Sequence, residues 1–308
     1  MEDDRPMPKV NEQVALRDFK YYIFDWDDNI LHMPTRIHLE KRQPDGTWRH
    51  HSVSTSVFSI VRQDTANYRP LHDDREAAFI EFQDDAPEAD RENRFVRDTE
   101  EAIHRVLSGK EAPGPSFTTF RRMLVEGRLF AIVTARGHAS GTLRKGVESF
   151  INLVLTPAER EEMLANLRGY RWCFDGVREF GTDQEEIDYY LGLNRYHAVT
   201  NPDFKAWMDQ YMNHTPTSEE RKQFAIRDFV EHLFHVLERM NADRYGWRPI
   251  SIGFSDDDPA NVAAVQKYIE EALGRRFPNV RFCVYDTSDP SIENGRKVTV
   301  SGQLDLGL

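Results

Sequence analysis

Short apolar runs separated by longer amphipathic segments dominate the pattern of this chain. Residues 129–133, Leu-Phe-Ala-Ile-Val, are uniformly apolar, and residues 250–254 and 280–285 have a similar character, so each predicts a buried strand. Aromatic residues make residues 21–24 and 170–174 two further strand candidates. Because strands that alternate with helices form parallel sheets, we predict an α/β fold with a parallel sheet of about five strands flanked by helices.

The pattern changes after the first predicted strand. Residues 36–41 alternate between apolar and charged positions, and Pro44-Asp45-Gly46 favours a turn, so residues 48–57 are expected to return as the second arm of a hairpin. In the later segments, apolar residues recur at helical spacing, and capping residues, Gly or Pro mark where each helix begins and ends. We expect these helices at residues 98–107, 116–126, 141–155, 158–167, 218–240 and 260–273.

Composition narrows the class of protein. The chain has 308 residues, enough for a large core in one elaborated domain or two. Its two cysteines are too few for a disulfide framework, its first residues are acidic where a secretory signal is basic, and no apolar run approaches the roughly 20 residues of a membrane span. We therefore expect a cytoplasmic enzyme without membrane association. The net charge of −12 disfavours broad nucleic-acid binding, which relies on Lys and Arg.

Two carboxylates follow the first predicted strand. Asp25 and Asp27 stand two residues apart, so they point to the same side of an extended chain. They are expected at the C-terminal edge of the sheet, where open α/β sheets bind ligands. One carboxylate can attack phosphorus and hold a metal while the other transfers a proton. The alternative interpretation is a solvated acidic turn, which the pair by itself does not exclude.

Polar residues follow two other predicted strands in the same way. Thr134 ends one apolar run, and Asp256, Asp257 and Asp258 follow another. An Asp-x-Asp box, a hydroxyl residue and a second acidic box, each behind an apolar run and in this order, resemble the haloacid dehalogenase (HAD) superfamily of phosphotransferases. That resemblance implies a Rossmann-like core with cap insertions. It covers residues 19–33, 117–174 and 219–287.

The resemblance implies a role for each box. Asp25 is expected to attack the phosphoryl group and become an aspartyl-phosphate, and Asp27 to serve first as general acid and then as general base. Mg²⁺ is the implied cofactor, since the anionic nucleophile and the phosphate repel each other. Its implied ligands are Asp25, the backbone carbonyl of Asp27 and one carboxylate of the second acidic box. Thr134 is expected to hold a phosphoryl oxygen.

The register of the second acidic box is open to two interpretations. A common family pattern has Gly-Asp directly after the strand, and Phe254 stands where that Asp falls. A second pattern pairs adjacent acids and often has Pro two residues later, which the residues ending in Pro259 fit better. We therefore take Asp256 as the first candidate for the metal ligand, Asp257 as the second and Asp258 as the third. A helix N-cap is the alternative role of these acids.

The family also has a basic residue that stabilises the charge on the nucleophile and phosphate. It normally begins the helix before the fourth strand, and Lys222 occupies that kind of place, although an exposed Lys is often only solvated. The alternatives nearby are Arg221, Arg227 and Lys205.

Four residues beside the boxes complete the candidate site or depart from the family pattern. Asp28 stands where Gly is frequent, and Asn29 stands where Thr is frequent, but neither change removes a reacting group. Arg136 and His138 follow Thr134 closely and are expected to touch substrate. Their alternative interpretation is a loop pair that faces water.

The resemblance divides the chain into a discontinuous core and insertions. The core comprises residues 1–33 and 116–308, and residues 34–115 form a cap insertion with the hairpin and helices; an irregular pattern suggests a second insertion at residues 175–218. Such caps cover the site and exclude water during chemistry. The hairpin is rich in basic residues, which suits an anionic substrate or, alternatively, a solvated face. These residues are Arg36, His38, Lys41, Arg42, Arg49, His50 and His51.

Asp27 also separates the reactions of the superfamily. An Asp at this position implies phosphomonoester hydrolysis or a phosphomutase, and hydrolysis needs only water. We therefore expect an Mg²⁺-dependent phosphatase that acts on a phosphorylated small molecule. Two alternatives stay open: a nucleic-acid or nucleotide end-processing phosphatase in a repair assembly, and a catalytically silent HAD-like scaffold that binds a partner.

Overall fold

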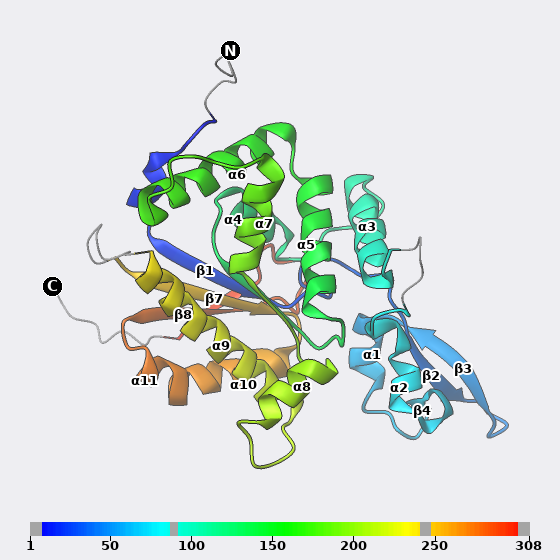
Figure 1. Cartoon of the computed structure of the whole chain (residues 1–308). Coiled ribbons are helices and arrows are strands. Elements are labelled where there is room, and N and C mark those ends of the chain that lie inside the picture. The colour runs from blue at the N-terminus through cyan, green and yellow to red at the C-terminus, as the bar shows by residue number, and fades with distance from the viewer. Residues whose placement is uncertain (1–7, 87–91, 241–247, 301–308) are drawn as a thin grey trace.

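A six-stranded sheet forms the centre of the molecule (Figure 1). The computed structural model describes residues 8–86, 92–240 and 248–300. Strands are arranged in the order β6-β5-β1-β7-β8-β9, and neighbours are parallel except β8 and β9. The predicted α/β fold is confirmed, and the sheet is compatible with a Rossmann-like arrangement. It has six strands where about five parallel strands were expected, and β9 is antiparallel. Its strands are β1 (Phe19–Phe24), β5 (Phe130–Thr134), β6 (Arg195–Ala198), β7 (Ile250–Asp256), β8 (Val280–Asp286) and β9 (Arg296–Val300).

Side chains that alternate along the central strand enter two cores, one on each face of the sheet. Ile23 packs into one core and Phe24 into the other, as the two-residue period of a strand requires. Helices α4, α5, α6 and α7 cover the Phe24 face, and α8, α9 and α10 cover the Ile23 face. Their bounds are α4 (Phe117–Val125), α5 (Ser140–Val154), α6 (Pro157–Tyr170), α7 (Asp183–Leu193), α8 (Pro202–Asp209), α9 (Ser218–Arg239) and α10 (Pro259–Tyr268), followed by α11 (Gly274–Arg276).

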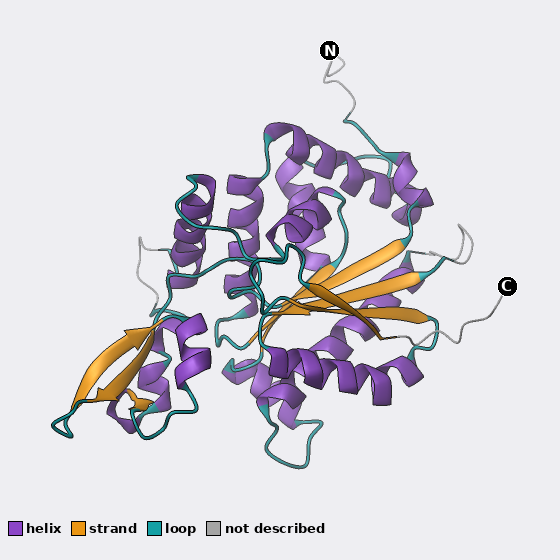
Figure 2. Ribbon diagram, turned by 180° about the vertical axis from the view of Figure 1, so that it is seen from behind, coloured by secondary structure: helices purple, strands orange, loops and turns teal. Residues whose placement is uncertain are grey.

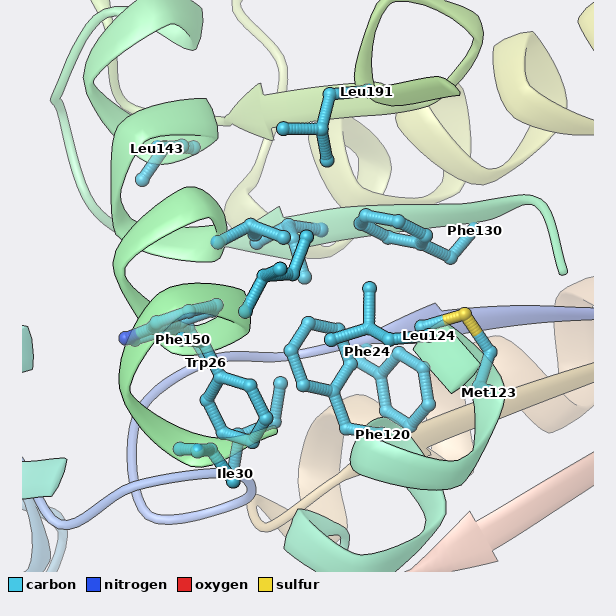
Figure 3. Close-up of a cluster of buried hydrophobic side chains, with 14 of the residues drawn as sticks. Phe24, Trp26, Ile30, Phe120, Met123, Leu124, Phe130, Leu143, Phe150 and Leu191 are labelled. Carbon is cyan, nitrogen blue, oxygen red and sulfur yellow. The ribbon is translucent and has the colours of Figure 1, made fainter. Parts of the chain in front are cut away.

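Aromatic rings fill the core on the Phe24 face (Figure 3). Phe120 of α4 meets Phe24 edge to face, with ring centroids 5.2 Å apart, and it meets Phe150 of α5 at 4.9 Å. Trp26, two residues beyond Phe24, packs in the same cluster and is fully buried. Edge-to-face rings of this kind stabilise a core beyond the area they bury. The segment that carries Asp25 and Asp27 is therefore anchored by the aromatic side chains between and beside them.

Residues 37–82 form a small lobe, here called the insertion lobe, beside the main sheet (Figures 1 and 2). A second sheet, in the order β3-β2-β4, packs through Ile37, Leu39 and Val53 against Phe82. Two short helices complete it. The bounds are β2 (Ile37–Arg42), β3 (Trp48–Val53), α1 (Thr55–Val61), β4 (Tyr68–Pro70) and α2 (Arg75–Ala78).

Helix α3 (Arg94–Leu107) follows the insertion lobe but packs on the main domain. Phe95 and Ile103 lie in the same core as Phe24. Gly146 of α5 is so close to Phe95 that a Cβ there would lie 2.5 Å from the ring. Residues 34–115 therefore contain two structural parts, a lobe with its own small core and a helix that belongs to the main one.

The structure corrects the prediction of a strand at residues 170–174. Residues 171–175 continue α6 as an irregular final turn, and the rings of Tyr170 and Phe174 stack at 6.1 Å, one turn apart. The missing parallel strand is β6, which pairs with β5 through hydrogen bonds. Because β6, α7 and α8 all lie within residues 175–218, that segment is part of the core sheet and its helices, so the prediction of an irregular second insertion there is wrong. The prediction at residues 170–174 was wrong because aromatic residues are equally compatible with a strand and with a buried helix end.

Smaller differences concern the edges of elements. Both arms of the hairpin are confirmed, but the second ends at Val53 because Ser54 caps α1. Helix α3 begins at Arg94, four residues before its predicted start, and strands β4 and β9 were not predicted. In the described residues no helix is both long and apolar enough to cross a membrane.

Candidate active site

Three neighbouring strands bring the predicted boxes to one edge of the sheet. Strands β5, β1 and β7 are adjacent and parallel, so their C-terminal ends meet at the same edge. Asp25 directly follows β1, Thr134 ends β5 and Asp256 ends β7. The Asp25 N–H donates to the carbonyl oxygen of Ser255 at 3.0 Å, which continues the pairing of β1 with β7 beyond the last strand residue.

Lys222 connects two of these strand ends. Its ammonium donates to Asp25 Oδ1 at 3.1 Å and to Asp256 Oδ2 at 2.6 Å, and all three side chains are buried. Lys222 lies in the second turn of α9, a helix that begins with a capping box between Thr217 and Glu220. The prediction that Lys222 reaches Asp25 agrees with this arrangement. Within the described chain, the alternatives Arg221, Arg227 and Lys205 make no hydrogen bond or ion pair with either carboxylate.

Buried charges determine the electrostatics of this cluster. Burial raises the pKa of Asp25, the nearby carboxylates of Asp256 and Asp27 raise it further, and the Lys222 ammonium opposes them. Burial by itself lowers the pKa of Lys222, but the attraction of Asp25 and Asp256 outweighs it, so that the pKa of Lys222 is raised. The Lys222 ammonium thus offsets only part of the negative charge of Asp25 and Asp256.

Arg136 binds the second carboxylate of the first box. Its Nε donates to Asp27 Oδ2 at 2.7 Å and its Nη2 to Asp27 Oδ1 at 2.6 Å, a two-point ion pair. The Arg136 side chain is 1% exposed. His138, two residues later, is fully buried against Phe95, and burial, followed by the charge of Arg136, lowers its pKa to about 2. A substrate contact by Arg136 or His138 would first require this burial to be undone, and neither faces water as a loop residue.

Asn29 holds the segment after β1 in place. Its Nδ2 donates to the Asp25 carbonyl at 2.9 Å and to Ser255 Oγ at 3.0 Å. Its Oδ1 accepts from Ser116 Oγ at 2.7 Å and from Thr287 Oγ1 at 2.9 Å. This fully buried amide joins β1, β7, β8 and the start of α4. Sequence reasoning noted Asn29 only as a departure from a pattern; an amide with two donors and an acceptor was the signal for this network.

Asp28 adopts a backbone conformation with φ +53°, in the left-handed region that Gly and Asp tolerate best. Its carboxylate accepts from Thr55 Oγ1 at 2.5 Å and contacts His32 Nδ1 at 2.8 Å. The departure from Gly at this position is therefore compatible with the turn. It also connects the turn to α1 of the insertion lobe.

The three acids of the second box have different surroundings. Asp256 bonds Lys222 through one oxygen, and its other oxygen accepts from the Asp258 N–H at 3.0 Å and from Asn261 Nδ2 at 3.2 Å. Asp258 caps α10, accepting from the Ala260 N–H at 2.9 Å, and pairs with Arg62 of the insertion lobe at 3.1 Å. Its expected alternative role as a helix cap agrees with this geometry.

Asp257 is the acid of this box without such partners. Among the described residues its carboxylate makes no hydrogen bond or ion pair. Burial raises the pKa of Asp257 well above its ordinary value, and the charges of Asp25 and Asp256 add to the shift. A cation beside Asp257 would relieve that repulsion.

The site has a few oxygen ligands for a small cation such as Mg²⁺, but no full set of protein ligands among the described residues. Within residues 8–86, 92–240 and 248–300, no group of three or more His, Cys, Asp or Glu side chains is arranged to hold a metal ion. Magnesium, however, is often bound by one or two carboxylates with several waters. Asp25, Asp257 and the Asp27 carbonyl provide such oxygens at one sheet edge, although the Asp27 carbonyl also accepts from the Asn29 N–H at 2.6 Å. Both oxygens of Asp256 are already engaged. The prediction that Asp256 precedes Asp257 as a metal ligand remains untested.

The basic residues of the hairpin do not form one surface. Lys41 lies opposite Arg49 in the antiparallel pairing of β2 with β3. His38 lies on the other face of β2, where its ring stacks on that of His50 with centroids 5.2 Å apart. His38 also contacts Glu81 at 3.0 Å. This division favours the alternative interpretation of a solvated hairpin over a single anion-binding cluster.

Thr134 is buried at the end of β5, and its Oγ1 accepts from the Arg136 N–H at 3.3 Å, so the hydroxyl hydrogen stays available to donate. The geometry therefore brings together Asp25, Asp256 and Lys222 directly, and Asp27, Asp257 and Thr134 around them. Comparisons of this chain with protein-family models, with curated proteins and with solved structures find no match.

Proposed function

We propose that this protein is an Mg²⁺-dependent phosphomonoester hydrolase of the HAD type, which acts through an aspartyl-phosphate on Asp25. The observation that supports the proposal most is the ammonium of Lys222 between Asp25 and Asp256. These residues come from three segments far apart in the sequence, and all three side chains are buried. An ordinary structural ion pair lies at the surface and does not bury three charged groups together. Buried charges with perturbed pKa values at the ligand-binding edge of an α/β sheet are typical of active sites.

The surplus of carboxylates supports the choice of a divalent cation. Asp25, Asp257 and the backbone carbonyl of Asp27 are the residues that would hold Mg²⁺, with Asp256 left to position Lys222. When bound, Mg²⁺ neutralises negative charge on the phosphoryl oxygens and the nucleophile. Burial raises the pKa of Asp257 and the charges of Asp25 and Asp256 raise it further, and this repulsion is the local reason to expect a cation there.

The residues of the chain divide the chemistry between them. Asp25 Oδ attacks phosphorus, a P–O bond to the carboxylate forms, and the P–O bond to the leaving alcohol breaks. Asp27 enters this step protonated and gives its proton to the leaving oxygen. Asp27 then takes a proton from water, whose oxygen attacks the same phosphorus. Phosphate leaves and the Asp25 carboxylate is restored. Lys222 stabilises the charge of Asp25, and Thr134 donates to a phosphoryl oxygen.

The net charge of the chain bears on the substrate class. We favour a phosphorylated small molecule in the cytoplasm, because the net charge of −12 opposes a nucleic-acid substrate. A nucleic-acid or nucleotide end-processing phosphatase and a catalytically silent scaffold are the competing outcomes of one test.

That test is a screen of phosphorylated sugars, nucleotides, amino acids and oligonucleotides, read by phosphate release with and without Mg²⁺. We expect Mg²⁺-dependent release from at least one monoester by the wild-type protein and none by Asp25→Asn. Asp188→Asn is the matched control, because Asp188 forms a half-exposed pair with Arg144 on the surface. Preference for oligonucleotides would favour end processing, and no hydrolysis of any compound would favour the scaffold.

A further inference from the structure

Residues of the 34–115 segment hold the ion pair between Arg136 and Asp27 in place. Arg136 Nη2, besides bonding Asp27, donates to Thr35 Oγ1 at 2.9 Å, and the Thr35 hydroxyl donates to Asp98 Oδ2 at 2.7 Å. Thr35 stands at the entry to the insertion lobe and Asp98 lies on α3. A continuous chain of polar contacts therefore runs from Asp27 to residues of the 34–115 segment.

Two aromatic rings fix the guanidinium in position. Arg136 Cζ lies 4.6 Å from the ring centroid of Phe82 and 5.1 Å from that of Phe95. Phe82 belongs to the core of the insertion lobe and Phe95 to α3. Stacking on aromatic faces is a favourable environment for a planar cation, and burial strengthens the attraction.

The backbone around Arg136 is attached to the same segment. The Gly137 N–H donates to the Phe82 carbonyl at 2.8 Å, and the Ala139 N–H donates to Asp84 Oδ2 at 2.8 Å. The loop after β5 is thus held by residues 82–84 on one side and carries Arg136 to Asp27 on the other. None of these contacts involves Asp25, Asp256 or Lys222.

We infer that Arg136 is a positioning residue for Asp27, and that residues 34–115 set its position through Thr35, Asp98, Phe82 and Phe95. This inference rests on the proposed function, in which Asp27 transfers the proton. A carboxylate can rotate about its Cβ–Cγ bond, and a two-point pair with a fixed guanidinium leaves it one orientation. Proton transfer needs the donor within hydrogen-bond reach of the leaving oxygen, so a loosened Asp27 slows the chemical steps more than it weakens substrate binding.

The test compares the same substitution at two buried threonines. Thr35→Val removes the hydroxyl that connects Arg136 to Asp98. Thr99→Val is the matched control, since Thr99 is buried on α3 and its hydroxyl has no hydrogen-bond partner among the described residues. Thr35→Ser restores the hydroxyl.

With the monoester that the wild-type protein hydrolyses, we expect Thr35→Val to lower kcat about tenfold and to leave KM within about twofold. Thr35→Ser should recover most of kcat, and Thr99→Val should keep it. Arg136→Lys, which keeps the charge but loses the fork, should lower kcat about 100-fold. Equal kcat values for Thr35→Val and Thr99→Val would overturn the inference while Asp25→Asn, if inactive, left the proposed function intact.

A second readout does not depend on activity. Asp27→Asn and Thr35→Val act on the same guanidinium, so their losses in Tm should be non-additive in the double variant. Asp27→Asn combined with Thr99→Val should be additive. Additive losses in both pairs would overturn the inference even if the wild-type protein hydrolysed nothing, an outcome that would by itself end the proposed function.

Discussion

Two buried cations serve the first acidic box, and they are held in different ways. Lys222 comes from α9 of the main domain and bonds Asp25 and Asp256, both at strand ends of the central sheet. Arg136 also comes from the main domain, but its stacking partners and its further hydrogen bond come from residues 34–115. Asp25, the proposed nucleophile, is thus stabilised by a cation whose partners all lie at strand ends of the main sheet. Asp27, the proposed proton-transfer residue, depends on a cation that residues 34–115 hold in place.

Because the two cations have different partners, the charge of Asp25 and the position of Asp27 can be changed separately. Altered residues in the insertion lobe can affect Asp27 through Arg136 without touching the Lys222 cluster. Altered residues in α9 affect the charge of Asp25 and leave Arg136 in place. Residues 34–115 provide these contacts of Arg136, so a change in this segment is expected to alter the proposed proton transfer by Asp27.

Removing Lys222 should have the largest effect. Lys222→Met leaves the carboxylates of Asp25 and Asp256 buried without their counter-charge, and breaking such a pair costs about 3–5 kcal/mol of unfolding free energy. Activity should fall below detection. Urea unfolding measures the loss, with Lys205→Met on the partly exposed α8 as the control. A loss smaller than about 1 kcal/mol would contradict a charge-balancing role for Lys222.

The Asp27→Asn variant should be slowed and not silenced. Loss of general acid–base catalysis costs about 10²–10⁴-fold in kcat, and both half-reactions lose their proton transfer. If the second half-reaction is slowed more, phosphorylated protein accumulates. Single-turnover kinetics with the chosen monoester measures both rates. An unchanged kcat would show that Asp27 does not transfer a proton. The proposed difference in role between Lys222 and Arg136 would then be wrong.

Much of this site could be predicted from the sequence because strand ends are marked by local composition. Asp25, Thr134 and Asp256 each follow an apolar run, and the rule for parallel sheets brings such ends together. The pairing of Asp27 with Arg136 could not be predicted, because an Arg two residues beyond a strand end can face water, substrate or a carboxylate. Only the tertiary position of Phe82 and Phe95 decides between these orientations.

The strands of the main sheet likewise differ in whether their own residues or a distant partner strand determines them. Strands β5, β7 and β8 were predicted from their apolar runs, and β1 from its aromatic residues. β6 was missed because its four residues, Arg-Tyr-His-Ala, carry no strand pattern, and the strand forms by pairing with β5. β9, at the opposite edge of the sheet, likewise depends on a partner far from it in the sequence.

The second acidic box provides a smaller, graded test. Asp257→Asn should raise the Mg²⁺ concentration needed for half-maximal activity at least about tenfold, because it removes a carboxylate from the proposed ligand set. Asp258→Asn should leave that concentration unchanged, since Asn also caps helices and only the pair with Arg62 is lost. Titration of activity with Mg²⁺ distinguishes the two. The reverse order would assign the ion to Asp258.

The smallest expected effect concerns His138, beside Arg136. Its folded pKa of about 2 lies below the ordinary value of 6.5, so only the unfolded chain takes up this proton as the pH falls below the ordinary value. This residue therefore removes about 1.4 kcal/mol of stability per pH unit below about pH 6.5. His138→Phe should lose less stability than the wild type between about pH 7 and about pH 5. Parallel pH profiles of unfolding free energy would contradict a neutral, buried His138.

The most direct measurement of the central claim is the location of the transferred phosphoryl group. Asp27→Asn is incubated with Mg²⁺ and the preferred monoester, quenched, digested and analysed by mass spectrometry. The account predicts a phosphoryl group on the peptide that contains Asp25, and none when Asp25→Asn is added. A phosphoryl group on another residue, or turnover of the monoester by a protein lacking the Asp25 carboxylate, would contradict it.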